Sequence, residues 1–183
     1  QVDHLVGANS PRLQEELEAV PPLVKDFIFN WQGHELNNFR NEFNSLLDDR
    51  EFPGWFESPR DYLRLISDEL VTNALVPDGS QVSVGLSVND KEIAVVVEDN
   101  QGLLDKKTLL NSLKRARDSH APKEGGRGAG LGLYLVYQST NQIWIDVRKN
   151  QGTKIICILE ATKRYKNFKG RHTSFHFRTQ EHP

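Results

Sequence analysis

The sequence has a single cysteine, no methionine, and no apolar stretch approaching the length of a membrane-spanning helix. One cysteine excludes a disulfide framework and a cysteine-based metal site. Cys157 lies in the apolar run 155–159, so we predict that it is a buried structural thiol. A spanning helix needs about 20 apolar residues, and no secretory signal is visible. These absences favour a cytoplasmic protein, and a chain that starts at Gln1 without methionine is expected to be a piece of a longer one.

The formal net charge of −2 hides an uneven distribution along the chain. Residues 161–183 carry six Lys or Arg and one acidic residue, a charge of +5, and the remainder carries −7. A basic tail can bind nucleic acid or an acidic partner. Here Phe175-His176-Phe177 interleaves aromatic residues with the charges, which favours a terminal strand lying back on the acidic body. Nucleic acid is therefore not the expected partner.

The most informative segment is GGRGAGLGL at 125–133, which holds five of the 13 glycines within eight positions. Glycine costs backbone entropy and weakens a helix. A sequence tolerates this where backbone must approach a ligand, and N–H groups at a helix start are suited to phosphate oxygens. Flexible linkers are polar, whereas this run continues into the apolar segment 134–137. We therefore predict a nucleotide phosphate loop.

Two common phosphate loops do not fit this segment. A Walker loop ends in Gly-Lys-Ser/Thr, and here neither a lysine nor a hydroxyl residue follows the last glycines. The dinucleotide fingerprint G-x-G-x-x-G directly follows a strand, but no frame gives that spacing and residues 118–124 form a polar stretch. The loop must belong to another nucleotide-binding design.

Periodicity predicts helices interrupted by two strand hairpins. Hairpins are expected at 81–88 with 92–98 and at 142–148 with 153–160, and helices are expected at 11–20, 35–47, 58–76, 105–117 and from the glycine loop to about 139. This order predicts an α+β fold, a two-layer α/β sandwich whose mixed, mostly antiparallel sheet is covered on one face by helices. We expect an N-terminal extension (1–34), a nucleotide-binding domain (35–160) and a basic C-terminal tail (161–183).

The helix expected at 58–76 carries two polar residues on its apolar side. A helical wheel places Glu69 and Asn73 on the packed face, one turn apart, while Asp68 points to solvent. A buried carboxylate is costly without a partner or a function. Glu69 could abstract a proton or orient water, and Asn73 could give Mg²⁺ a neutral oxygen ligand. The alternative is that Glu69 pairs with an arginine nearby, Arg60 or Arg64.

Asp99 ends an apolar strand and is followed by the turn Asn100-Gln101-Gly102. Its carboxylate could accept a hydrogen bond from an exocyclic amine and so select adenine. The alternative is an aspartate that only stabilises the turn, a common role.

Together these segments resemble the GHKL superfamily of ATPases and kinases, which includes DNA gyrase-type ATPases, heat-shock chaperones, histidine kinases and bacterial anti-sigma-factor kinases. The matching segments are DELVTNA at 68–74, EDNQGL at 98–103 and GRGAGLGL at 126–133, in the family's order and spacing. Gly152-Thr153 stands where the family has a Gly-Thr at a strand start. The similarity covers roughly 35–160 and implies ATP and Mg²⁺ as cofactors.

The resemblance implies a role for each matching residue. Glu69 takes the position of the base, Asn73 would hold Mg²⁺, Asp99 and Gly102 would form the adenine end, and the Thr153 hydroxyl would help to hold it. Phosphate contacts are implied for Gly128, Gly130, Leu131 and Gly132, and for Lys123 and Arg127 of a lid at 118–127, unless these two are only exposed lid charges. The second motif departs from D-x-G-x-G, because Gln101 and Leu103 occupy its glycine positions and Gly102 is out of step.

The short lid and the E-x-x-x-N helix are closest in style to anti-sigma-factor serine/threonine kinases. We predict an ATP·Mg-binding regulatory domain that transfers the γ-phosphate to a protein partner: a sigma factor, an anti-sigma antagonist or another regulator. A homodimer is an alternative oligomeric state that the sequence leaves open. One alternative is a histidine-kinase catalytic domain, although only 39 residues separate His34 from Asn73, too few for a dimerisation hairpin. The other is a nucleotide-gated interaction module without catalysis, which the altered second motif favours.

Overall fold

The computed structural model describes residues 28–32, 35–49, 60–75, 80–119, 131–160 and 173–180. The helix expected at 11–20 lies outside the described residues, as do His34 and residues 120–130. None of the described helices is long and apolar enough to cross a membrane.

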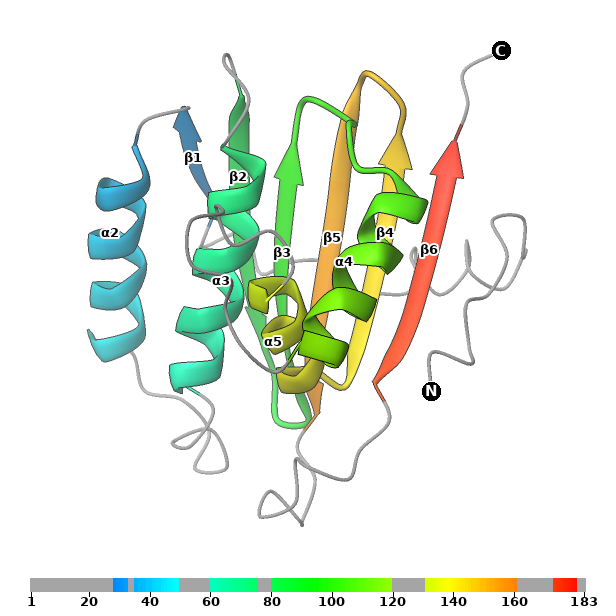
Figure 1. Cartoon of the computed structure of the whole chain (residues 1–183). Helices are drawn as coiled ribbons and strands as arrows, with labels where there is room; N and C mark the ends of the chain where they lie inside the picture. Colours follow the sequence, from blue (N-terminus) through cyan, green and yellow to red (C-terminus); the bar gives the residue numbers. More distant parts are fainter. Residues whose placement is uncertain are drawn as a thin grey trace.

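A mixed sheet of six strands forms one layer of the fold, in the order β1-β2-β3-β5-β4-β6 (Figure 1). Neighbouring strands are antiparallel except for β4 and β6, which run parallel. The predicted hairpins are β2–β3 and β4–β5, so the predicted α+β class is confirmed. The strands are β1 (Ile28–Gln32), β2 (Gln81–Val88), β3 (Glu92–Asp99), β4 (Gln142–Arg148), β5 (Gly152–Glu160) and β6 (Ser174–Gln180).

The described helices lie on one face of this sheet, as predicted (Figure 1). Apolar residues at helical spacing turn them toward it: in the first helix Phe39, Phe43 and Leu47 are buried. The central helix, which carries Glu69, packs against the last helix and against β3. The helices are α2 (Leu36–Asp49), α3 (Arg60–Ala74), α4 (Lys106–Ser119) and α5 (Leu131–Ser139).

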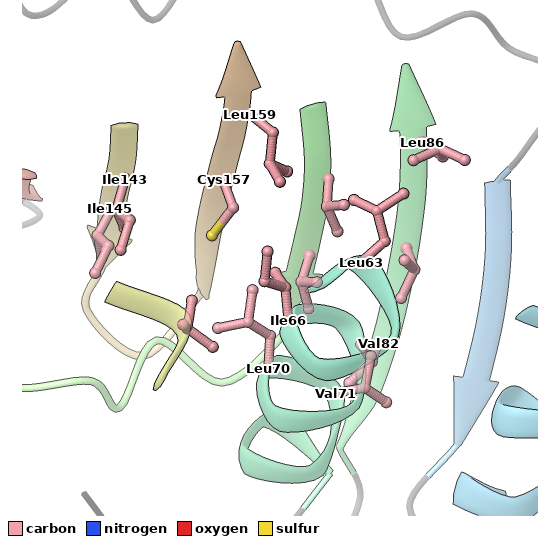
Figure 2. Packing of buried hydrophobic residues seen from close by; sticks show 14 of the residues in the cluster. Leu63, Ile66, Leu70, Val71, Val82, Leu86, Ile143, Ile145, Cys157 and Leu159 are labelled. Atoms are coloured by element: carbon pink, nitrogen blue, oxygen red, sulfur yellow. The ribbon is translucent and has the colours of Figure 1, made fainter. Parts of the chain in front are cut away.

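The main core lies between the helices and the sheet (Figure 2). Leu63 and Ile66 of α3 point toward the strands, where Cys157 of β5 is buried among apolar side chains. Burial raises the pKa of the Cys157 thiol, as expected for the predicted structural cysteine. Side chains alternate along each strand, so Val96 and Trp144 belong to a second buried cluster on the other face.

The outer strands β1 and β6 lie in the predicted N-terminal extension and the predicted C-terminal tail, and both join the sheet. The expected terminal strand is confirmed in β6, where Phe175 and Phe177 are buried. Arg178 of β6 donates two hydrogen bonds, of 2.8 and 2.6 Å, to the Asp146 carboxylate of β4. Their side chains are only 15% and 6% exposed, so a buried ion pair holds β6 to its neighbour.

Loss of this ion pair should destabilise the fold. In Arg178→Met the Asp146 carboxylate keeps only the Gln180 amide as a described side-chain donor, and the free energy of unfolding in urea should fall by about 3 kcal/mol. Arg117→Met is the matched control, because Arg117 and Asp118 are half-exposed, and it should cost less than about 1 kcal/mol. Equal losses in the two variants would contradict a stabilising role for the buried pair.

Candidate nucleotide-binding site

The carboxylate of Asp99, at the end of β3, organises the first part of the site. Its Oδ1 accepts hydrogen bonds from the backbone N–H groups of Gln101, Gly102 and Thr153, at 2.8, 3.1 and 3.2 Å. No described residue donates to Oδ2. The proposed turn role is therefore confirmed. The second carboxylate oxygen of Asp99, Oδ2, stays available to a ligand.

Thr153 lies directly across from Asp99, because the two residues are register partners in β5 and β3. Strand alternation places both side chains on the helix-covered face of the sheet. Thr153 is 3% exposed, and its Oγ1 has no hydrogen-bond partner among the described residues. An unpaired buried hydroxyl costs about 1–3 kcal/mol. The pair therefore fits a site at which a polar ligand, such as the edge of a base, completes the hydrogen bonding.

Gly102 holds the turn after β3 against the turn between β4 and β5. Its φ is +64°, and an added Cβ would lie 2.1 Å from the Arg148 carbonyl oxygen and 2.9 Å from the Asn150 nitrogen. Gln101 and Leu103, at the glycine positions of the family motif, do not have positive φ. The steric need for glycine thus falls on Gly102, so the departure from the motif agrees with the shape of this turn.

The second part of the site lies between α3 and α5. A Cβ added to Gly132, the second residue of α5, would lie 1.8 Å from Oε2 of Glu69. The Glu69 carboxylate thus occupies the space that a side chain at position 132 would take, and a larger residue there would displace it. Arg64, one expected partner of Glu69, instead binds Asp48 and Asp61. The pairing alternative is wrong: Glu69 forms no ion pair with any described residue.

The same end of the molecule brings the two helices and the sheet together. Asp99 pairs with Val82 near the start of β2, which follows α3 in the chain. Asn100 Oδ1 accepts a hydrogen bond from the Gln81 N–H, so the end of β3 is tied to the strand that comes after α3. Figure 1 shows the ends of α3 and β3 and the turn between β4 and β5 at this edge.

The family model of the histidine kinase-, DNA gyrase B- and HSP90-like ATPases matches residues 59–163, more than half of the chain. The chain belongs to this family. The match runs from α3 through β5, so it includes Glu69, Asp99, Gly132 and Thr153. A search of curated proteins finds no significant match to the chain. The protein is thus a GHKL-type, ATP-binding ATPase or kinase domain.

Electrostatics distinguish Glu69 from its neighbour in this GHKL domain. Burial raises the pKa of Glu69; the nearby Asp68 charge also raises it, and Arg40 lowers it. Arg40 of α2 binds the Asp68 carboxylate through Nε and, at 2.9 Å, through Nη2. Asp68 is therefore an ion-paired residue and not simply a solvated one. Sequence reasoning missed Arg40, because it lies 28 residues away and carries no signal beyond its charge.

Asn73 is exposed and does not lie on the packed side of α3, which corrects the helical-wheel prediction. A wheel gives the direction of a side chain but not where the covering layer stops, and Asn73 is the penultimate residue of α3. No group of three or more His, Cys, Asp or Glu suited to a metal exists in the described ranges. An exposed amide oxygen fits Mg²⁺, which binds few protein ligands and keeps waters and phosphate oxygens.

The remaining expected phosphate contacts lie outside the described residues. These are Lys123, Arg127, Gly128 and Gly130. Leu131 is the first residue of α5, so the segment does open a helix, as the sequence indicated. The direct contacts of all these residues with phosphate stay predictions.

Substitution of Gly102 should destabilise the protein by distorting the turn after β3, which forms part of the proposed adenine end. Gly102→Ala places a methyl group against backbone atoms that cannot rotate away, and adds the strain of a positive φ. We expect a loss of about 2–4 kcal/mol in urea unfolding. The control is Leu103→Ala at the exposed neighbouring position, which should change the free energy of unfolding by less than about 0.5 kcal/mol. An equally small change in Gly102→Ala would show that the turn is not rigid.

The raised pKa of Glu69 predicts a pH dependence of stability. Because the folded state holds the proton more tightly than the unfolded state, the contribution is full below the ordinary value of 4.5 and is lost as pH rises through the folded pKa. Wild-type protein should therefore lose stability relative to Glu69→Gln as pH rises above 4.5. Urea midpoints of both proteins across this range test it, and parallel profiles would contradict the prediction.

Proposed function

We propose that this GHKL domain is a serine/threonine kinase of the anti-sigma-factor type, which binds Mg·ATP and transfers the γ-phosphate to a hydroxyl of a regulatory protein. The observation that carries the proposal is the Glu69 carboxylate, which is half-buried, has no ion-pair partner among the described residues and packs against the start of α5. Burial and the Asp68 charge raise its pKa and so strengthen it as a base.

The adenine end would be held by β3 and β5. Asp99 Oδ2 would accept a hydrogen bond from the exocyclic amine, because Oδ1 is already bound to three backbone N–H groups. The Thr153 hydroxyl, which is buried and has no partner among the described residues, would supply the second polar contact. A carboxylate acceptor favours adenine over guanine, whose corresponding position is a carbonyl.

The phosphate end would be held by α5 and the glycine loop. Unpaired N–H groups and the helix dipole at the start of a helix favour anions, and Gly132 leaves room there for Glu69. The exposed Asn73 amide would hold Mg²⁺, which when bound neutralises charge on the phosphates.

Glu69 would act on the proton of the attacking hydroxyl. As the hydroxyl oxygen bonds to the γ-phosphorus, its proton passes to a Glu69 oxygen, the bond to the bridging oxygen breaks, and ADP leaves. A base with a raised pKa accepts this proton more readily than an exposed carboxylate. A sigma factor, an anti-sigma antagonist or another regulator is proposed as the partner, and a homodimer stays compatible with the fold.

Two alternatives make different predictions. A histidine-kinase catalytic domain would need an upstream sensor and dimerisation hairpin, and its product would be acid-labile phosphohistidine. An interaction module would bind nucleotide without turnover. The altered second motif no longer favours the module, because Gly102 meets the one steric requirement for glycine observed in this turn.

The proposal is tested by incubation with labelled ATP, Mg²⁺ and a lysate that supplies the partner, followed by identification of the phosphorylated residue. Wild type should yield acid-stable phosphoserine or phosphothreonine, and Glu69→Gln should lower transfer by about 100-fold or more. Asp61→Asn is the matched control, because it removes an exposed carboxylate of the same helix that pairs with Arg64, and it should change transfer by less than about threefold. Unchanged transfer in Glu69→Gln would refute the catalytic role.

A further inference from the structure

The start of β6 is bonded to the end of α5. The Thr173 hydroxyl lies 2.7 Å from the Tyr137 carbonyl oxygen and 2.9 Å from that of Thr140, and donates to this pair. The N–H of Ser174 donates to the Asn141 carbonyl at 2.9 Å. The Phe175 ring lies against that of Tyr137, with centroids 6.5 Å apart. Figure 1 shows the beginning of β6 and the end of α5 at the same end of the molecule.

These contacts matter because α5 is a weak helix by itself. It has nine residues, whereas isolated helices shorter than about 12–15 residues are marginal in water. Gly132 in its first turn costs about 1 kcal/mol relative to alanine. The last carbonyl groups of a helix lack partners within the helix, and here two threonine hydroxyls donate to them. Thr140 donates to the Val136 carbonyl at 3.0 Å, and Thr173 donates to the carbonyls that follow it.

The β6 strand is an addition to the matched family domain, because the match ends at residue 163 and β6 begins at Ser174. It is nevertheless held firmly: its far half carries the buried Arg178–Asp146 pair. The Lys149 N–H also donates to the Gln180 carbonyl at 3.3 Å. A strand fixed along its length thus fixes one end of α5, and Glu69 packs on the other.

We propose that Thr173 is a positioning residue that acts through α5 to set the affinity for the phosphate end of the nucleotide. The inference rests on the proposed nucleotide site. Without the Thr173 hydroxyl the last turn of α5 loosens, and the helix start is placed less firmly beside Glu69. The adenine contacts come from Asp99 and Thr153, on β3 and β5, so they are independent of this effect.

The test compares Thr173→Val, which has the same shape without the hydroxyl, with Thr173→Ser, which keeps it. Thr179→Val, at an exposed position of the same strand, is the control. Thr173→Val should weaken Mg·ATP binding about tenfold in calorimetry, because carbonyl groups at the helix end lose their donor. Adenosine affinity, measured by competition, should stay within about twofold in all variants, and Thr173→Ser and Thr179→Val should match wild type with both ligands.

Equal weakening of Mg·ATP and adenosine, or no weakening of either, overturns the inference. Should Thr173→Val not fold, Phe175→Leu weakens a second contact between β6 and α5, that of the Phe175 ring with the Tyr137 ring, and carries the same expectation. Hydrogen exchange in the nucleotide-free protein separates the two hypotheses: Thr173→Val should speed exchange across residues 131–139. Unchanged exchange there refutes the positioning role. If exchange is faster in Thr173→Val but the wild-type protein binds no nucleotide, the proposed function alone is refuted.

The coupling is reciprocal by thermodynamic linkage. Mg·ATP should therefore slow exchange of the backbone amides of β6 in wild type, and adenosine should not. A domain in which adenosine protects β6 as well as Mg·ATP does would contradict the inference.

Discussion

The site depends first on one carboxylate oxygen. Oδ1 of Asp99 accepts three backbone hydrogen bonds, from the turn after β3 and from the start of β5. Hydrogen bonds to an ionised acceptor contribute about 1.5–3 kcal/mol each, so this oxygen fixes where Gly102 and Thr153 lie. It also leaves Oδ2 and the Thr153 hydroxyl side by side on neighbouring strands. The proposed adenine end is thus formed by the same interaction that ends the strand.

The proposed phosphate end depends on a short helix held at both ends. Glu69 fills the space left by the missing side chain of Gly132, and Thr173 binds the carbonyl groups at the far end. The first contact comes from α3, inside the matched family domain, and the second from β6, outside it. A helix that is marginal by itself takes its position from its neighbours, and this is the basis of our proposal that the C-terminal strand influences the phosphate end of the site.

Much of the fold and part of the site could be predicted from the sequence. The hairpins, the buried strand before Asp99, the helix that carries Glu69 and the buried Cys157 follow from periodicity, and the ATPase family follows from three spaced motifs. The exposure of Asn73 could not be predicted, because a wheel does not show where packing ends. The ion pairs of Asp68 with Arg40 and of Arg64 with Asp48 could not be predicted either, because charges on separate helices pair according to how those helices pack.

The sequence by itself determined which residue types stand at each motif position, and with them the family and the ligand class. Local periodicity and backbone preferences are properties of neighbouring residues, so they can be read along the chain. Only the tertiary structure decided that Gly102 meets the need for glycine in the second motif, that Glu69 has no arginine partner among the described residues, and that β6 belongs to the sheet and binds α5. Each of these depends on contacts between segments distant in the chain, where packing sets the geometry.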